Sequence, residues 1–192
     1  MTLEKINHGT TALVLIDLQN GIARQSVAPH DSREVLSNAA QLARAFRGAG
    51  APVILVRVGY SAGGGEMLRT EVDQPRPASG PLPTDFSEIV QELEQVETDI
   101  VVTKHNWSAF YGTDLDVQLR RRGIKSIVLG GISTNMGVES TARSAHEHAY
   151  NLILVEDAMA SMAGSDHLFA VERIFPRIGQ VVSTQDVLSA MA

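Results

Sequence analysis

Cysteine is absent from this 192-residue sequence, so a thiol nucleophile and any disulfide bond are excluded. Long hydrophobic runs are also absent, because no stretch reaches the about eighteen apolar residues that a membrane-spanning helix needs. The amino terminus, MTLEKINHGT, has no apolar core of the signal-peptide type. We therefore expect a cytoplasmic protein with no membrane contact.

Basic residues are the minority among the charged ones, with 16 Lys and Arg against 22 Asp and Glu, giving a formal net charge of −6. A nucleic-acid partner needs a basic stripe, so we expect none. The basic run at residues 120–122 ends a predicted helix just before Gly123. Cations at that place complement the helix dipole, and a solvated helix end is the favoured interpretation of this run.

Six short runs rich in Val, Ile and Leu are nearly continuous rather than alternating, which is typical of strands covered on both faces. Segments of helical length lie between them. This alternation predicts a single α/β domain over residues 1–192, with a doubly wound, six-stranded, mostly parallel sheet and helices on both faces in a Rossmann-like three-layer arrangement. The predicted strands are 11–16, 52–58, 99–103, 126–132, 151–155 and 180–183, and the predicted helices are 33–48, 114–122, 135–149, 166–175 and a short one after Thr184.

Residues 60–85 interrupt this rhythm with glycines first and prolines later. The segment is too long for a plain connection between two elements of a compact domain. We therefore predict that it is a lid over the site or an interface loop.

Ligands of open parallel sheets bind beyond the carboxyl ends of the strands. Asp17 follows the first apolar run, Lys104 the third and the turn GGISTNMG the fourth, while Glu156 and Asp157 follow the fifth. A carboxylate, an ammonium group and a helix amino terminus with free N–H groups should therefore converge at one edge of the sheet. Each also has a plain structural interpretation, since an acidic residue can cap a turn or helix and a lysine can be solvated.

Several motifs that would indicate other chemistry are missing. GGISTNMG is neither a Walker loop nor a G-x-G-x-x-G fingerprint. His146 and His148 are two residues apart on a predicted helix, so they point in different directions and cannot form the i, i+4 zinc pair. Trp107, Phe110 and Tyr111 either line a pocket or pack the start of a helix.

Three blocks carry a resemblance that extends over roughly residues 10–190. They are IDLQ after the first strand, K-x-x-x-S-A-F-x-x-T-x-L after the third and G-I-S-T-N-x-G-V-x-S-T-A-R after the fourth. Together, in this order, they resemble the isochorismatase-like hydrolases, also called the cysteine hydrolase superfamily. The resemblance places the family's catalytic aspartate on Asp17, its lysine on Lys104, and its nucleophilic cysteine on Gly137.

The same resemblance implies a cis peptide bond between Ile132 and Ser133 and substrate contacts around it. Members of the family are commonly oligomers, so we expect a dimer or tetramer of identical chains, with residues 60–85 near an interface or over the site. The expected partner is a small-molecule substrate. The predicted substrate-binding residues are Gln19, Trp107, Phe110, Ile132, Ser133, Asn135 and Met136.

Two departures from the family pattern bear on the chemistry. Gly137 stands where the cysteine would be, and the stretch after the second strand, RVGYSAGGGEM, lacks the Asp-x-His metal motif of nicotinamidase-type members. Amide hydrolysis through a thioester is therefore not expected. We expect no metal at the site, because this loop offers no clustered ligands, and no cofactor.

A smaller branch of the family, the true isochorismatases, resembles this chain better, since it keeps the aspartate and lysine and has glycine in place of cysteine. These enzymes cleave a vinyl ether, in which a carboxylic acid protonates the vinyl carbon and water attacks the oxocarbenium ion. Asp17 would be the general acid, Lys104 an electrostatic partner and the helix end at Gly137 a surface for polar oxygens of a small anionic substrate. A nearby Lys⁺ lowers the pKa of an aspartate, so burial has to outweigh it.

Other functions remain open at this point. Asp17 as a general base on water, with the Ile132 and Ser133 N–H groups holding an oxyanion, would hydrolyse an amide or ester. A hydroxyl nucleophile from Ser133 or Thr134 is disfavoured, because neither occupies the cysteine's position. The chain would otherwise be a catalytically inactive member that binds a metabolite or a protein.

Overall fold

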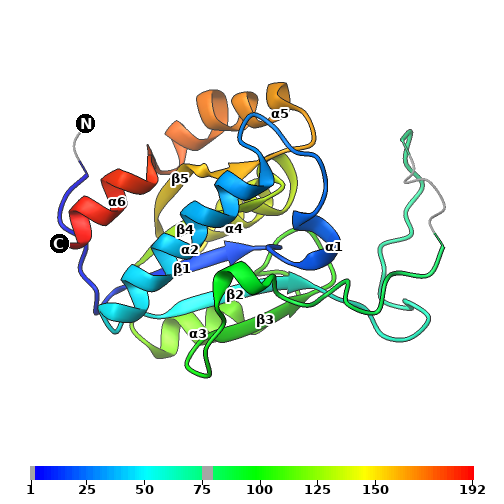
Figure 1. Ribbon diagram of the computed structural model, residues 1–192, viewed down its shortest axis with the longest axis horizontal. Coiled ribbons are helices and arrows are strands. Elements are labelled where there is room, and N and C mark those ends of the chain that lie inside the picture. The colour runs from blue at the N-terminus through cyan, green and yellow to red at the C-terminus, as the bar shows by residue number, and fades with distance from the viewer. Residues whose placement is uncertain (1–2, 75–79) are drawn as a thin grey trace.

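The computed structural model describes residues 3–74 and 80–192. Their strands form one six-stranded sheet in the order β3-β2-β1-β4-β5-β6, and every neighbouring pair is parallel (Figure 1). The mostly parallel sheet expected from the sequence is therefore fully parallel within the described residues. The strands are β1 (Thr11–Ile16), β2 (Val53–Val58), β3 (Ile100–Lys104), β4 (Ser126–Ile132), β5 (Asn151–Ala160) and β6 (Gln180–Val182).

The central strand β1 shows why the apolar runs are continuous, because all six of its residues are buried. Leu13 and Leu15 belong to the core on one face of the sheet, whereas Val14 and Ile16 belong to the core on the other. Successive side chains of a strand point to opposite faces, so a strand covered on both sides needs apolar residues at every position. Each fully buried side chain of this size contributes about 1.5–3 kcal/mol to folding.

Helices supply the two outer layers, as expected (Figure 1). Buried residues of α2 (Ser32–Gly48) and α6 (Thr184–Met191) join the core on the face of Leu13, and those of α3 (Leu115–Arg121) and α4 (Glu139–Glu147) join the opposite core. The remaining elements are short: α1 (Asn20–Ala23), α5 (Gly164–Phe169), the 3-10 turns η1 (Gln91–Leu93) and η4 (Phe175–Arg177), and the π-helical turns η2 (Thr134–Val138) and η3 (Ala170–Ile174).

β5 differs from the prediction, which ended this strand at residue 155. It continues to Ala160, and the register shifts where two steps along β4 meet five along β5, from the pair Leu129–Leu154 to the pair Gly131–Met159. Glu156 therefore lies inside the strand rather than after it. Such an irregularity leaves residues outside the ladder and re-aims their side chains. It explains how polar residues interrupt an otherwise apolar strand.

The predicted helix over residues 135–149 is divided in the structure. Residues Thr134–Val138 form η2, and α4 begins only at Glu139. Single π-helical turns of this kind are frequent at functional sites. The predicted helix 166–175 is similarly divided between α5 and η3.

The segment between β2 and β3 extends away from the sheet (Figure 1). Leu68 and Val72 are exposed there. Residues 75–79 of the predicted lid or interface loop lie outside the described residues, and the role of the segment stays a prediction. Among the described residues, no helix combines the length and the apolar character that crossing a membrane would require.

Candidate active site

The strand order places a crevice between β1 and β4. The chain runs outward from β1 through β2 to β3, and then returns to the other side of β1 for β4. At such a switch point the connections diverge to opposite faces, and this is where ligands of doubly wound sheets bind. Asp17 directly follows β1 and Ser133 directly follows β4, so both lie at this point.

Asp17 has a left-handed backbone with φ of 55°, which is uncommon for a residue other than glycine. Its N–H group donates to Val56 O at 2.8 Å, and its carbonyl accepts from Gln19 N at 2.9 Å. Gly131 on β4 lies close behind, because a Cβ there would be 2.2 Å from Ile16 O. The conformation at the end of β1 is therefore held from both neighbouring strands.

Lys104, the last residue of β3, pairs with Asp17. Its Nζ donates to Asp17 Oδ2 at 2.8 Å and to Asn106 O at 3.1 Å. Asp17 is 5% exposed and Lys104 2% exposed. The other carboxyl oxygen, Asp17 Oδ1, is buried and forms no hydrogen bond to any described residue. One oxygen of the carboxyl group is thus fixed by the ammonium group, and the other is left for a further partner.

Burial raises the pKa of Asp17 to about 6, against the lowering effect of the charge and hydrogen bond of Lys104. Removal from water disfavours the charged carboxylate, and here that effect exceeds the attraction of the ammonium group. The effect of burial on the Asp17 pKa is therefore larger than the opposing effect of Lys104. A carboxyl group with this pKa populates both protonation states near neutral pH, as an acid or base in catalysis requires.

Gly137 lies against this pair. A Cβ at position 137 would be 3.0 Å from Asp17 Oδ2 and from Ile16 Cγ2, and 3.7 Å from Lys104 Nζ. The structure thus brings together Asp17, Lys104 and Gly137, the three residues predicted to be catalytic. Any side chain at position 137 would project directly onto the carboxyl group.

The turn after β4 is tied down through Asn135. The peptide bond between Ile132 and Ser133 is cis. Ser133 Oγ and Ser161 Oγ both donate to Asn135 Oδ1 at 3.0 Å, and Asn135 Nδ2 donates to Asp166 Oδ2 at 3.2 Å. The polar groups of Ser133 and Asn135 are therefore engaged with each other and with neighbouring segments. Met136, in the same turn, is half-buried.

Two predicted substrate-binding residues, Gln19 and Phe110, have their main contacts away from Asp17. The Gln19 amide is buried and faces the backbone, since its nitrogen donates to Val58 O and Phe86 O and its oxygen accepts from Val58 N. Phe110 stacks on His148, which follows the far end of α4, with ring centroids 5.1 Å apart. Trp107 is 49% exposed. The structure does not direct the Gln19 amide or the Phe110 ring toward Asp17.

Sequence reasoning missed a second polar cluster, formed by His30, Glu156 and His167. The nitrogen and oxygen atoms that these side chains offer lie within 4.8 Å of one another. His30 precedes α2, whereas His167 lies in α5. The two residues are 137 positions apart in the sequence, so no local spacing indicates that they are neighbours. The one available signal is Glu156, a charged residue that interrupts an apolar strand.

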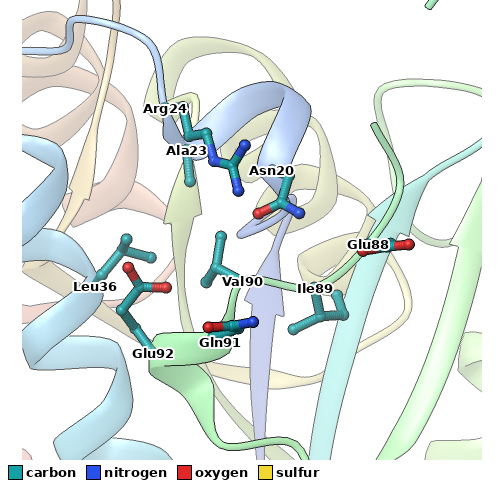
Figure 2. A pocket seen from close by; sticks show the side chains of 9 residues that line it. All are labelled: Asn20, Ala23, Arg24, Leu36, Glu88, Ile89, Val90, Gln91 and Glu92. Atoms are coloured by element: carbon teal, nitrogen blue, oxygen red, sulfur yellow. The ribbon is translucent and has the colours of Figure 1, made fainter. Parts of the chain in front are cut away.

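A cavity of about 200 Å³ lies beside the carboxyl end of the sheet (Figure 2). Asn20, Arg24, Glu88 and Glu92 contribute polar side chains to its wall, but neither Asp17 nor Lys104 borders it. The aspartate–lysine pair is thus separate from this cavity.

Comparison with known proteins identifies the family of this chain. Residues 11–186 match the family described as Isochorismatase domain. The isochorismatase family protein YecD of Escherichia coli O157:H7 is 48% identical over 187 residues, which cover 97% of this chain and 99% of the relative. The ureidoacrylate amidohydrolase RutB of Klebsiella pneumoniae is 33% identical, covering 95% and 88% of the two chains.

A solved structure gives the same result for the fold. An isochorismatase family protein from Burkholderia thailandensis superposes with a TM-score of 0.93 at 46% identity, over 98% of this chain and 99% of its own. The fold and the relatives together define a hydrolase whose fold has three layers, a parallel sheet between two layers of helices. The chain belongs to the isochorismatase family.

Proposed function

We propose that this hydrolase cleaves a small anionic vinyl ether without a cysteine nucleophile and that Asp17 is its general acid. The observation that supports this most directly is Asp17 itself. Its Oδ1 is buried and unpaired among the described residues, and burial raises its pKa to about 6. A carboxyl group with a free oxygen and a raised pKa suits proton donation near neutral pH.

In the proposed reaction, the Asp17 carboxyl group transfers its proton to the terminal carbon of the vinyl group. The carbon–carbon double bond supplies the electron pair for the new C–H bond, and the ether carbon becomes an oxocarbenium ion. Water adds to that carbon and loses a proton to the Asp17 carboxylate. The resulting hemiketal collapses to a ketone and an alcohol, so no covalent enzyme intermediate is needed.

Lys104 and Gly137 have supporting roles in this proposal. The Lys104 ammonium group holds Asp17 Oδ2 at 2.8 Å and stabilises the carboxylate that forms after proton transfer. Gly137 leaves the space next to Oδ2 free of a side chain, since a Cβ there would be 3.0 Å from that oxygen. Because Asp17 is 5% exposed, substrate reaches Oδ1 only if surrounding groups move.

A second candidate is water-mediated hydrolysis of an amide or ester, with Asp17 as general base. It is favoured by the relative RutB, which carries the name ureidoacrylate amidohydrolase. A pKa of about 6 leaves most Asp17 ionised at pH 7, which suits a base. A Ser133 nucleophile is less compatible with the structure, because its hydroxyl donates to Asn135 Oδ1.

The experiment compares wild type with Asp17→Asn on a panel of carboxylated vinyl ethers, amides and esters. Glu97→Gln, which makes the same carboxylate-to-amide change at an exposed position before β3, is the control. General acid catalysis contributes about 10²–10⁴-fold, so Asp17→Asn should lose at least that much vinyl-ether turnover while the control keeps it. Turnover in D₂O should place one deuterium on the methyl group of the ketone product, because the proton on carbon comes from an exchangeable acid.

Two other outcomes would replace the proposal. Turnover of amides or esters alone, dependent on Asp17, would establish the general-base function. Wild type and Asp17→Asn that are equally inert on the whole panel, yet bind the same metabolite equally well, would identify a binding protein instead.

A further inference from the structure

The His30–Glu156–His167 cluster joins three separate parts of the chain. His30 comes from the segment between α1 and α2, Glu156 from the irregular part of β5, and His167 from α5. His30 Nε2 donates to Glu156 Oε1 at 2.8 Å, and His167 Nε2 donates to the same oxygen at 3.1 Å. The two ring nitrogens and the carboxylate therefore point to one place.

The outer nitrogen of each imidazole also has a partner. His30 Nδ1 lies 3.1 Å from Glu34 Oε1, and His167 Nδ1 lies 2.9 Å from Thr134 Oγ1. Histidines that bind metals almost always direct their second nitrogen to a carboxylate or another oxygen, which fixes the ring orientation and the tautomer. Both histidines of the cluster have this arrangement.

Burial leaves the cluster closed on one side and accessible on the other. His167 is fully buried, whereas the side chains of His30 and Glu156 are 19% and 32% exposed. Glu156 Oε1 accepts from both histidines, so its carboxylate faces the two Nε2 atoms. With Glu34 beside His30, the cluster offers two carboxylates to a cation that arrives from solvent.

We propose that His30 Nε2, His167 Nε2 and Glu156 form a binding site for a divalent transition metal ion such as Zn²⁺. Two imidazoles and one carboxylate are a usual ligand set for zinc with a fourth position open to water. The present N···O separations of 2.8 and 3.1 Å need only a small expansion to admit an ion with ligands at about 2.0–2.2 Å. The expectation of no metal rested on the loop after β2, which does not contribute to this cluster.

Metal binding would replace the two hydrogen bonds from the histidine Nε2 atoms to Glu156 by bonds to the ion. Each imidazole gives up the proton on Nε2 to solvent and carries its one remaining proton on Nδ1, so that the Nε2 lone pair is free for the metal. Glu34 then accepts from His30 Nδ1–H, and the Thr134 hydroxyl, which can donate or accept, accepts from His167 Nδ1–H. Since Thr134 begins η2, the ion would anchor the turn that also carries Gly137.

The test is an isothermal titration calorimetry experiment, in which ZnCl₂ alone is added to untagged protein that has been treated with a chelator. We expect one Zn²⁺ per chain. His30→Gln and Glu156→Gln, both at partly exposed positions, should bind at least about 100-fold more weakly, and Glu34→Gln, which changes only the outer partner, about 10–100-fold more weakly. His146→Gln changes an exposed histidine and should bind as wild type does.

Circular dichroism checks that each variant is folded, and a Co²⁺ titration adds an independent readout, because ligation by the cluster should give visible d–d absorption that His30→Gln abolishes. Asp17→Asn should bind Zn²⁺ as wild type does, so this result is separate from the catalytic proposal. Failure of wild type to bind one ion per chain, or equal affinity in folded His30→Gln and Glu156→Gln, would overturn the proposed metal site.

Discussion

Replacement of Lys104 by methionine isolates the electrostatic coupling at the centre of the site. Lys104 Nζ lies 2.8 Å from Asp17 Oδ2, and both side chains are buried. Two unit charges at this separation interact by about 6 kcal/mol at an effective dielectric constant of about 20, which is an upper bound because burial also penalises the ammonium group. An adjacent opposite charge typically lowers the pKa of a carboxyl group by about 1–3 pH units.

Without the lysine, only burial acts on Asp17, and its pKa of about 6 should rise by about 1–3 pH units in Lys104→Met. The assay is a carboxyl ¹³C NMR titration, in which the Asp17 resonance is assigned by its absence in Asp17→Asn. Lys125→Met, at an exposed position, is the control and should leave the midpoint unchanged. A midpoint that stays or falls in Lys104→Met would refute the reasoning that burial and Lys104 act in opposition.

Four further results are expected. Gly131→Ala should destabilise the fold by about 3 kcal/mol or more in urea unfolding, since its φ is 132° and the new Cβ would be 2.2 Å from Ile16 O; unchanged stability would contradict the close approach. Asp99→Asn should cost about 1.5–3 kcal/mol by the same assay, because it breaks the partly buried, charge-assisted pair with Arg47 at 2.7 Å; a loss below about 1 kcal/mol would show that the pair is dispensable. Gly137→Cys should not gain efficient amidase activity, and an amide turnover comparable to vinyl-ether turnover would count against the proposed substrate class. Light scattering at micromolar concentration should show a dimer or tetramer, and a monomer would refute the predicted assembly.

The strands could be predicted because a strand that is buried on both faces is a continuous run of apolar residues in the sequence. β1 and β4 match their predicted bounds, since each is an uninterrupted apolar run. The extension of β5 to Ala160 could not be predicted, because its polar residues leave the ladder at an irregularity that depends on pairing with β4. Apolar continuity predicts a buried strand but not the register at which two strands meet.

Part of the candidate site could likewise be predicted from the sequence, and part of it could not. The convergence of Asp17 and Lys104 follows from topology, since residues after parallel strands lie at one edge of the sheet. The orientation of Gln19 depends on backbone groups near residues 58 and 86, which no local pattern reveals. The contacts of His30 with Glu156 join positions 126 residues apart, so they appear only in three dimensions.

The most direct test of Asp17 as a general acid is the pH dependence of kcat/KM for a carboxylated vinyl ether. A general acid must be protonated in the free enzyme, and burial raises the pKa of Asp17 to about 6. We predict that kcat/KM is level below about pH 6 and falls about tenfold per pH unit above it, and that Asp17→Asn lacks this activity throughout. A profile that rises through pH 6, or vinyl-ether turnover that persists in Asp17→Asn, would contradict the account.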